Sequence, residues 1–212
     1  MSVQSISQAA QDIFVYNFLG RKSGFFLDFG CGDGINNPCG SNTYYLEHNG
    51  WDGLSIDYTD WVIRDFNNNR KTKSVCKDLR YENINQLLKD NNCPAVIDYL
   101  SFDVDDGTEG ALGFFPLQDF KFKVITFEHD LYHMGDKRKN LAFDKFKDEY
   151  EILIENIVLS KHGAYEDWYI HKSLCADLNK IFLKNVTPNE ILNAYGISGG
   201  RENYDGRIFN IN

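Results

Sequence analysis

Short apolar runs recur along the chain, and most of them end at or just before an acidic residue. They span residues 25–28, 53–57, 74–76, 96–103 and 122–127. Their length and their many aromatic and branched side chains are typical of buried strands. We therefore predict a strand in each of the five runs.

Apolar positions at helical spacing separate these runs, as Ile13 and Phe14 do near the N-terminus. The predicted helical segments are residues 5–18, 43–48, a stretch through Leu87, residues 109–115 and a charged stretch after Lys137. Strands that alternate with helices form a parallel sheet whose two faces are both covered by helices. The pattern therefore predicts an α/β fold.

The C-terminal third of the chain has a different pattern. Residues 150–159 and 164–170 indicate a terminal hairpin, and the tail at 196–212 is rich in Gly and Asn. We expect this tail to be a loop, a lid or a partner-binding segment. Because no linker or repeat divides the chain, residues 1–212 are expected to form one domain.

Composition narrows the class of protein. Of the 212 residues, 42% are apolar and 25% are charged, as in an ordinary globular protein. The formal charge of -9 argues against a nucleic-acid-binding surface, which is normally basic. The five cysteines are scattered, and the sequence has neither a signal-peptide pattern nor a long apolar run. We expect a soluble cytoplasmic protein that binds no membrane.

Three glycines at every second position follow the first predicted strand, in the segment Asp28-Phe29-Gly30-Cys31-Gly32-Asp33-Gly34. Glycine lets the backbone bend and lets a ligand approach bare N–H groups. A phosphate loop would need a Lys-Ser or Lys-Thr pair, which is missing here. The dinucleotide pattern would need a third glycine where Ile35 stands. Asp33 would also repel a pyrophosphate.

The remaining pattern, Asp-x-Gly-x-Gly-x-Gly, resembles the first motif of class I S-adenosylmethionine-dependent methyltransferases. This resemblance implies that Asp28, Gly30, Gly32 and Gly34 bind the cofactor. Since that cofactor carries a positive sulfonium, acidic residues near the turn are favourable.

Acids at the ends of the other strands extend the predicted cofactor site. Ligands of open parallel sheets bind beyond the carboxyl ends of the strands. Asp57 ends the second strand about twenty residues after the glycines, where a carboxylate accepts both hydroxyls of a ribose. Asp78, after the third strand, is a candidate acceptor for the adenine amino group. Asp103, at the end of the fourth strand, completes the predicted cofactor-binding set.

Further segments resemble one branch of this family, the FkbM-type methyltransferases. The matching segments are Ser7-Gln8, Gln11-Asp12, residues 24–28, 41–43, 46–47, 49–54, 98–105 and 124–130, and Tyr165-Glu166-Asp167-Trp168. The resemblance covers about residues 7–172. It implies a Rossmann-like, seven-stranded, mostly parallel sheet with helices on both faces and an antiparallel terminal strand. It also implies S-adenosylmethionine as donor and O-methylation of a hydroxyl, often on a sugar.

Two departures from the FkbM-type pattern concern the acceptor more than the fold. Sequences of this type commonly have Asp-Val-Glu-Gly-Ala-Glu after the fourth strand, whereas this chain has Asp103-Val104-Asp105-Asp106-Gly107-Thr108-Glu109. The usual Gly-Ala after the first-strand acid is Gly30-Cys31 here.

The ends of the fourth and fifth strands supply candidates for catalysis, because a sugar hydroxyl is a poor nucleophile without a base or a metal. One hypothesis places Mg²⁺ or Mn²⁺ on Asp105, Asp106, Glu128 and His129, which offer oxygen and nitrogen ligands. The other makes His129 the base, oriented by Asp105 or Asp130. The acceptor is expected to be a small molecule or a glycan.

Other functions remain open at this point. The same residues suit methylation of a small non-sugar alcohol or phenol. The chain also suits an inactive cofactor-binding module of a glycan-synthesis assembly. A nucleic-acid N-methyltransferase is disfavoured, because Asp103-Val104-Asp105-Asp106 stands where Asp-Pro-Pro-Tyr or a relative of it is expected.

Overall fold

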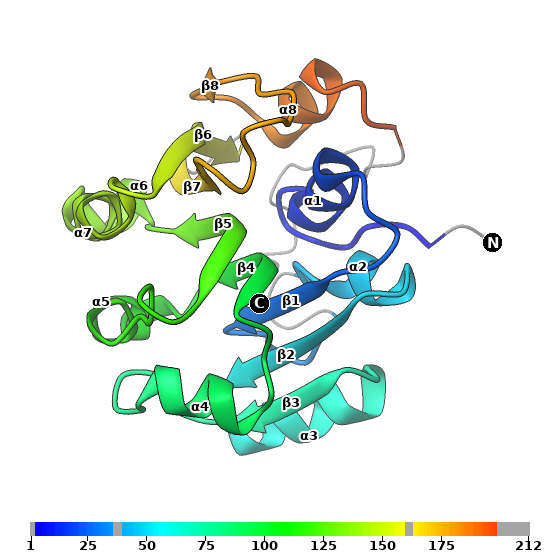
Figure 1. Cartoon of the computed structure of the whole chain (residues 1–212), viewed down its shortest axis with the longest axis vertical. Coiled ribbons are helices and arrows are strands. Elements are labelled where there is room, and N and C mark those ends of the chain that lie inside the picture. The colour runs from blue at the N-terminus through cyan, green and yellow to red at the C-terminus, as the bar shows by residue number, and fades with distance from the viewer. Residues whose placement is uncertain (1–2, 36–39, 160–162, 199–212) are drawn as a thin grey trace, which may run out of the picture.

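The computed structural model describes residues 3–35, 40–159 and 163–198, which are built around an eight-stranded sheet (Figure 1). In spatial order its strands are β3 (Lys73–Cys76), β2 (Asp52–Asp57), β1 (Phe25–Phe29), β4 (Val96–Phe102), β5 (Lys121–Glu128), β7 (Gly163–His171), β6 (Tyr150–Leu159) and β8 (Leu183–Lys184). The first five are parallel to one another, and β7 is antiparallel to β5. The predicted parallel sheet and its antiparallel terminal strand are therefore confirmed, and the short β8 is an additional eighth strand.

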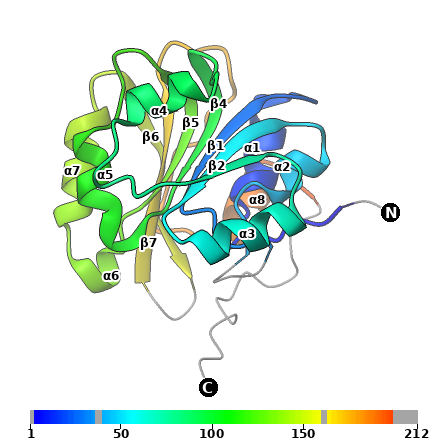
Figure 2. The same ribbon diagram turned by 90° about the horizontal axis from the view of Figure 1, so that it is seen from below.

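Helices cover both faces of the sheet, as predicted (Figure 2). One face carries α1 (Gln11–Leu19), α2 (Tyr44–His48) and α8 (Pro188–Ala194), and the other carries α4 (Ile84–Asp90), α5 (Thr108–Gly113) and α7 (Lys137–Phe146). A further helix, α3 (Asp60–Asn69), follows β2. A 3₁₀ turn, η1 (Asp105–Gly107), and the short helix α6 (Leu131–Met134) follow β4 and β5.

Neighbouring residues of a strand contribute to two separate cores. Phe26 packs in a cluster with Phe14 and Trp168, whereas Leu27 packs in a cluster with Leu88 and Phe146. This follows from the alternation of side chains along a strand, which fills both faces of a covered sheet. The double core fixes the register of the strands and hence the positions of their carboxyl ends.

The prediction of a helix over residues 5–18 is wrong at its start. The helix begins only at Gln11, after Ala10 adopts a left-handed conformation with φ of 65°. Asp12 Oδ1 accepts hydrogen bonds from Ser5 Oγ and from Ser7 Oγ, the latter at 2.8 Å. These side-chain bonds hold the preceding segment in a bent path, because short polar side chains compete with helical bonding.

Three helices, α3, α6 and α8, are absent from the sequence prediction. The predicted hairpin is confirmed by β6 and β7, while most of the tail at 196–212 lies outside the described residues. In the described part of the chain, no helix combines the length and apolar character needed to cross a bilayer.

Candidate functional site

A cavity of about 860 Å³ lies at the carboxyl ends of the parallel strands. Its lining includes Gly30 and Asp57 after β1 and β2, and Asp103 and Glu128 after β4 and β5. In this sheet β1 lies between β2 and β4, so the chain order reverses beside β1. Ligands of open α/β sheets bind at such a reversal.

The glycine turn after β1 forms one wall of the cavity. Gly30, Gly32 and Gly34 have φ values of 81°, 56° and 79°, a left-handed region that favours glycine. A Cβ atom on Gly30 would overlap the carbonyl oxygen of Asp103. Gly30 and Gly32 line the cavity, whereas Gly34 packs against Phe66 and Arg70 and is not part of the described lining.

Asp57 lies at the same wall and fixes the turn. Its Oδ2 atom accepts a hydrogen bond from the Gly32 N–H at 3.3 Å, and its Oδ1 atom accepts from the Thr59 N–H at 2.9 Å. A carboxylate has about four lone-pair positions, so these two bonds leave Asp57 able to accept from a ligand.

Asp78 and its neighbours form the outer edge of this wall. Asp78 pairs with Arg80 at 2.6 Å, and that bond lowers the pKa of the Asp78 carboxyl. The Arg80 guanidinium lies 6.0 Å from the centre of the Tyr58 ring, and 69% of Tyr58 is exposed. Asp78 lines the cavity, but it already has a cation as partner.

Asp28 is buried at the floor of the cavity. Burial raises its pKa to about 6, and hydrogen bonding from Thr43 and the charge of Arg70 oppose that rise. Thr43 Oγ1 donates to Asp28 Oδ2 at 2.7 Å. Asp28 therefore connects the strand to the polar loop that precedes α2.

The ends of β4 and β5 bring two carboxyl groups into contact at the other side of the cavity. Phe102 pairs with Phe127 in the sheet, so the next residues, Asp103 and Glu128, are neighbours. Their side chains are hydrogen-bonded to each other. Burial, followed by the negative charge of nearby carboxylates, raises the pKa of both groups well above the usual range.

Arg138 connects the loops that follow these two strands. It projects from α7 with 5% of its side chain exposed, and it contacts Asp130 at 3.2 Å and Asp106 at 3.3 Å. Its Nε atom is buried without a hydrogen-bond acceptor among the described residues. Arg138 also lines the cavity, so a buried N–H donor is present in the wall.

The structure does not support the predicted catalytic role of His129. This side chain is fully buried and is not part of the described cavity lining. Its Nδ1 atom accepts a hydrogen bond from the Leu131 N–H at 3.1 Å, so the ring proton is on Nε2, which lies 3.3 Å from Asp167 Oδ1. The reason is alternation: Glu128 faces the cavity, and the next residue along the chain faces away from it.

The predicted metal ligands are not brought together. His129 faces Asp167, and the Asp106 side chain is 93% exposed and pairs with Arg138. Across residues 3–35, 40–159 and 163–198, no group of three or more His, Cys, Asp or Glu side chains is arranged to hold a metal ion. We therefore assign no residue to a metal.

Several residues of the lining are absent from the predicted site. They are Gln8, Ser41, Asn42, Lys77, Arg80, Tyr132, His133, Arg138 and Tyr165. Ser41 and Asn42 belong to a polar loop between two predicted elements, and binding residues are often found in such loops, so the sequence could have indicated them. Arg138 lies on a charged helix and has no local signal, because only the packing of α7 brings it to the cavity.

Comparisons with known proteins place this architecture. No protein-family model matches the sequence, and no curated protein matches it. Solved structures do match. One is an S-adenosylmethionine-dependent methyltransferase from Clostridium acetobutylicum, with a TM-score of 0.53 and 11% identity over 79% of this chain and 92% of that one.

Two further structures agree. A protein from Clostridium thermocellum, provisionally described as an rRNA methylase, has a TM-score of 0.52 and 12% identity over 81% of this chain and 98% of that one. The Dnmt2 methyltransferase of S. pombe has a TM-score of 0.52 and 12% identity over 70% of this chain, which spans about half (49%) of the Dnmt2 chain. At these identities the likeness concerns the fold alone. This chain has the fold of the class I S-adenosylmethionine-dependent methyltransferases.

Proposed function

We propose that the protein is an S-adenosylmethionine-dependent methyltransferase that methylates a hydroxyl of a sugar or glycan. The observation that carries the proposal is the continuity of the cavity. It joins the glycine turn and Asp57 at one side to the Asp103 and Glu128 carboxyls at the other. A donor and an acceptor can therefore meet within one cavity.

The residues at the β1 and β2 ends fit the donor. Gly30 and Gly32 expose backbone to the cavity, and Asp57 has lone pairs free for a ribose diol. The donor supplies a methyl group carried on a positively charged sulfur. Asp28 and Asp103 place negative charge in the same cavity, which favours binding of a cation over binding of a pyrophosphate.

The residues at the β4 and β5 ends fit an acceptor rich in hydroxyl groups. The carboxyls there accept hydrogen bonds from hydroxyls, and the Arg138 guanidinium lies in the same lining. Tyr132, 53% exposed at the same side, offers an aromatic face. Transfer would be a direct in-line displacement, for which the cavity supplies proximity and orientation.

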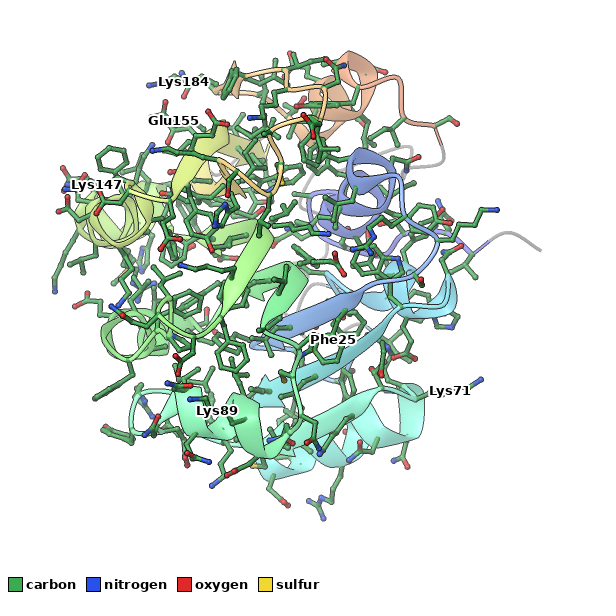
Figure 3. The ribbon with its side chains drawn as sticks, in the orientation of Figure 1. Phe25, Lys71, Lys89, Lys147, Glu155 and Lys184 are labelled. Atoms are coloured by element: carbon green, nitrogen blue, oxygen red, sulfur yellow. The ribbon has the colours of Figure 1, made fainter. Side chains whose placement is uncertain are left out.

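A nucleic-acid acceptor fits this cavity poorly, although two of the structural neighbours are named for RNA or as Dnmt2. Phosphates would meet the acids of the cavity wall in a chain with a net charge of -9. Figure 3 shows Lys71, Lys89, Lys147 and Lys184 on different sides of the molecule, pointing outward. These four lysines do not form a continuous path for a phosphate backbone.

Two assays on the unaltered protein test the proposal. Calorimetry should show binding of S-adenosylhomocysteine, the product of the donor. A screen with methyl-labelled donor should show transfer to a member of a panel of free sugars, nucleotide sugars and methyl glycosides. We expect EDTA to leave this activity unchanged, because the described residues assemble no metal site.

The outcomes separate the competing functions. Transfer only to phenols or simple alcohols would replace the sugar by the alternative acceptor class. Binding without transfer to any acceptor would favour a cofactor-binding module. No binding would reject the methyltransferase assignment itself.

A further inference from the structure

Asp103 occupies a special position between the two sides of the cavity. Its N–H donates to the Phe29 carbonyl at 3.0 Å, and its own carbonyl packs against Gly30. Its side chain meets Glu128 of the neighbouring strand. The Asp103 backbone thus contacts the glycine turn, and the Asp103 carboxyl group lies at the acceptor side.

The contact between Asp103 and Glu128 requires a proton. Two ionised carboxylates in contact repel each other, and such a pair keeps one proton between them. One carboxyl group of the pair therefore donates its O–H and the other accepts it.

The surrounding charges favour retention of this proton. Asp105 of η1, Asp130 before α6 and Glu166 of β7 add negative charge around the pair. Arg138 of α7 is a cation on this side, and it is already bonded to Asp106 and Asp130. These surroundings therefore hold the shared proton on the pair.

Three other candidate bases in this region are less suited. Asp106 is largely exposed and paired with Arg138, Asp130 is paired with the same Arg138, and His129 is buried against Asp167. Asp103 combines a place in the cavity lining with a partner that holds its carboxylate in a fixed orientation.

We propose that the Asp103 carboxylate takes the proton of the attacking hydroxyl, and that Glu128 positions Asp103 by donating its own proton in a hydrogen bond. The inference rests on the proposed function and specifies its chemistry. The hydroxyl oxygen bonds to the methyl carbon while the carbon–sulfur bond breaks, and its electron pair stays on sulfur. The hydroxyl proton moves to Asp103, which leaves the pair neutral until the proton is released to solvent.

Isosteric variants test these two roles. Asp103→Asn removes the base, so kcat for the best sugar of the panel should fall by about a hundredfold or more. Glu128→Gln keeps an N–H donor toward Asp103 and should cost only about tenfold, because the amide N–H donates more weakly than the carboxylic acid O–H. Asp144→Asn, an exposed acid that pairs with Lys147, is the matched control and should leave kcat unchanged.

Binding of S-adenosylhomocysteine, measured by calorimetry, separates a base from a cofactor ligand. We expect all three variants to bind it as the unaltered protein does. If Asp103→Asn abolishes this binding, Asp103 is a cofactor ligand and the inference is overturned. Equal kcat values in Asp103→Asn and the unaltered protein would overturn it too, as would a larger loss in Glu128→Gln than in Asp103→Asn.

A second measurement needs no acceptor. The infrared spectrum of the unaltered protein with S-adenosylhomocysteine at neutral pH should contain the carbonyl band of a protonated carboxyl that is missing from Glu128→Gln. Identical spectra would overturn the shared proton even if no sugar were found. Failure of the proposed function would show instead in the unaltered protein, as absence of binding or of transfer to sugars.

Discussion

The two sides of the cavity are built in different ways. At the β1 and β2 ends the wall is built around backbone, which Gly30 and Gly32 hold in a left-handed turn and Asp57 anchors. At the β4 and β5 ends the wall is made of side chains that contact one another across strands, as Asp103 and Glu128 do. The first wall is set by local sequence, and the second by which strands and helices become neighbours.

This difference has a functional meaning. A wall built around backbone suits a ligand that is the same in all related proteins, because its binding does not depend on the identity of many side chains. A side-chain wall can vary with the acceptor while the sheet stays the same. We therefore expect substitutions at the glycine turn to affect folding and donor binding together, and substitutions of the side chains that line the cavity at the other side to affect mainly transfer.

The largest effect should come from Gly30→Ala. Its Cβ would overlap the Asp103 carbonyl at a positive φ, and strain plus overpacking should cost about 4 kcal/mol or more of unfolding free energy. Gly113→Ala is the control, because a Cβ there meets no atom within 4 Å, and it should be neutral or stabilising by up to about 1 kcal/mol. Urea unfolding measures both; a stable Gly30→Ala protein would contradict the backbone-wall description.

His129→Ala should lower stability more than it lowers catalysis. Removing the buried ring opens a cavity and leaves Asp167 without one partner, which should cost about 3 kcal/mol in urea unfolding. The exposed His133, which lines the cavity, serves as the control, and His133→Ala should retain stability. A hundredfold loss of kcat in folded His129→Ala would return His129 to the catalytic role predicted from sequence.

Asp57→Asn should weaken donor binding without unfolding the protein. The amide keeps one acceptor oxygen but loses the charge, so the affinity for S-adenosylhomocysteine should fall about ten- to a hundredfold. Asp60→Asn removes the same charge three residues away at an exposed position and should bind normally. Calorimetry on both variants decides whether Asp57 contacts the donor.

The smallest effect is a pH dependence from Glu166, behind the acceptor side. Burial raises its pKa from 4.5 to about 7, although Trp168 and Gln11 donate hydrogen bonds that oppose the rise. The folded protein thus holds a proton that the unfolded chain releases near pH 4.5. The stabilisation is complete below that pH and is lost as pH rises to about 7, by on the order of 2 kcal/mol.

Glu166→Gln should remove this pH dependence. The amide oxygen keeps an acceptor for Trp168 and Gln11, so the fold should be retained. Urea unfolding between pH 4.5 and 8 should give a flatter stability profile for the variant. Profiles of equal slope would show that Glu166 is not the group responsible.

Much of the fold could be predicted from the sequence because buried strands have a distinct local pattern. The apolar runs before Asp28, Asp57 and Asp103 correspond to β1, β2 and β4. The start of α1 could not be predicted in this way, because Asp12 binds Ser5 and Ser7 through tertiary geometry rather than helical periodicity. The helix α3 was not predicted because its apolar run is short and it ends in three asparagines, Asn67, Asn68 and Asn69, which have low helix propensity.

The candidate site divides in the same way. Asp57, Gly30 and Gly32 could be placed at the cavity because they lie at or just after a strand end. His129 could not be assigned, since a one-residue step along the strand turns a side chain from the cavity to the core. The contact between Asp103 and Glu128 depends on the pairing of β4 with β5, which no local pattern encodes.

Arg138 has a consequence for how this protein can change. By bonding to both Asp106 and Asp130, it joins η1 to the start of α6 from a third element, α7. Substitutions of Asp106 and Asp130 should then have non-additive effects, because both acids bond to the same Arg138 side chain. To transfer the acceptor preference of one related chain to another, residues 105–138 must therefore be exchanged together.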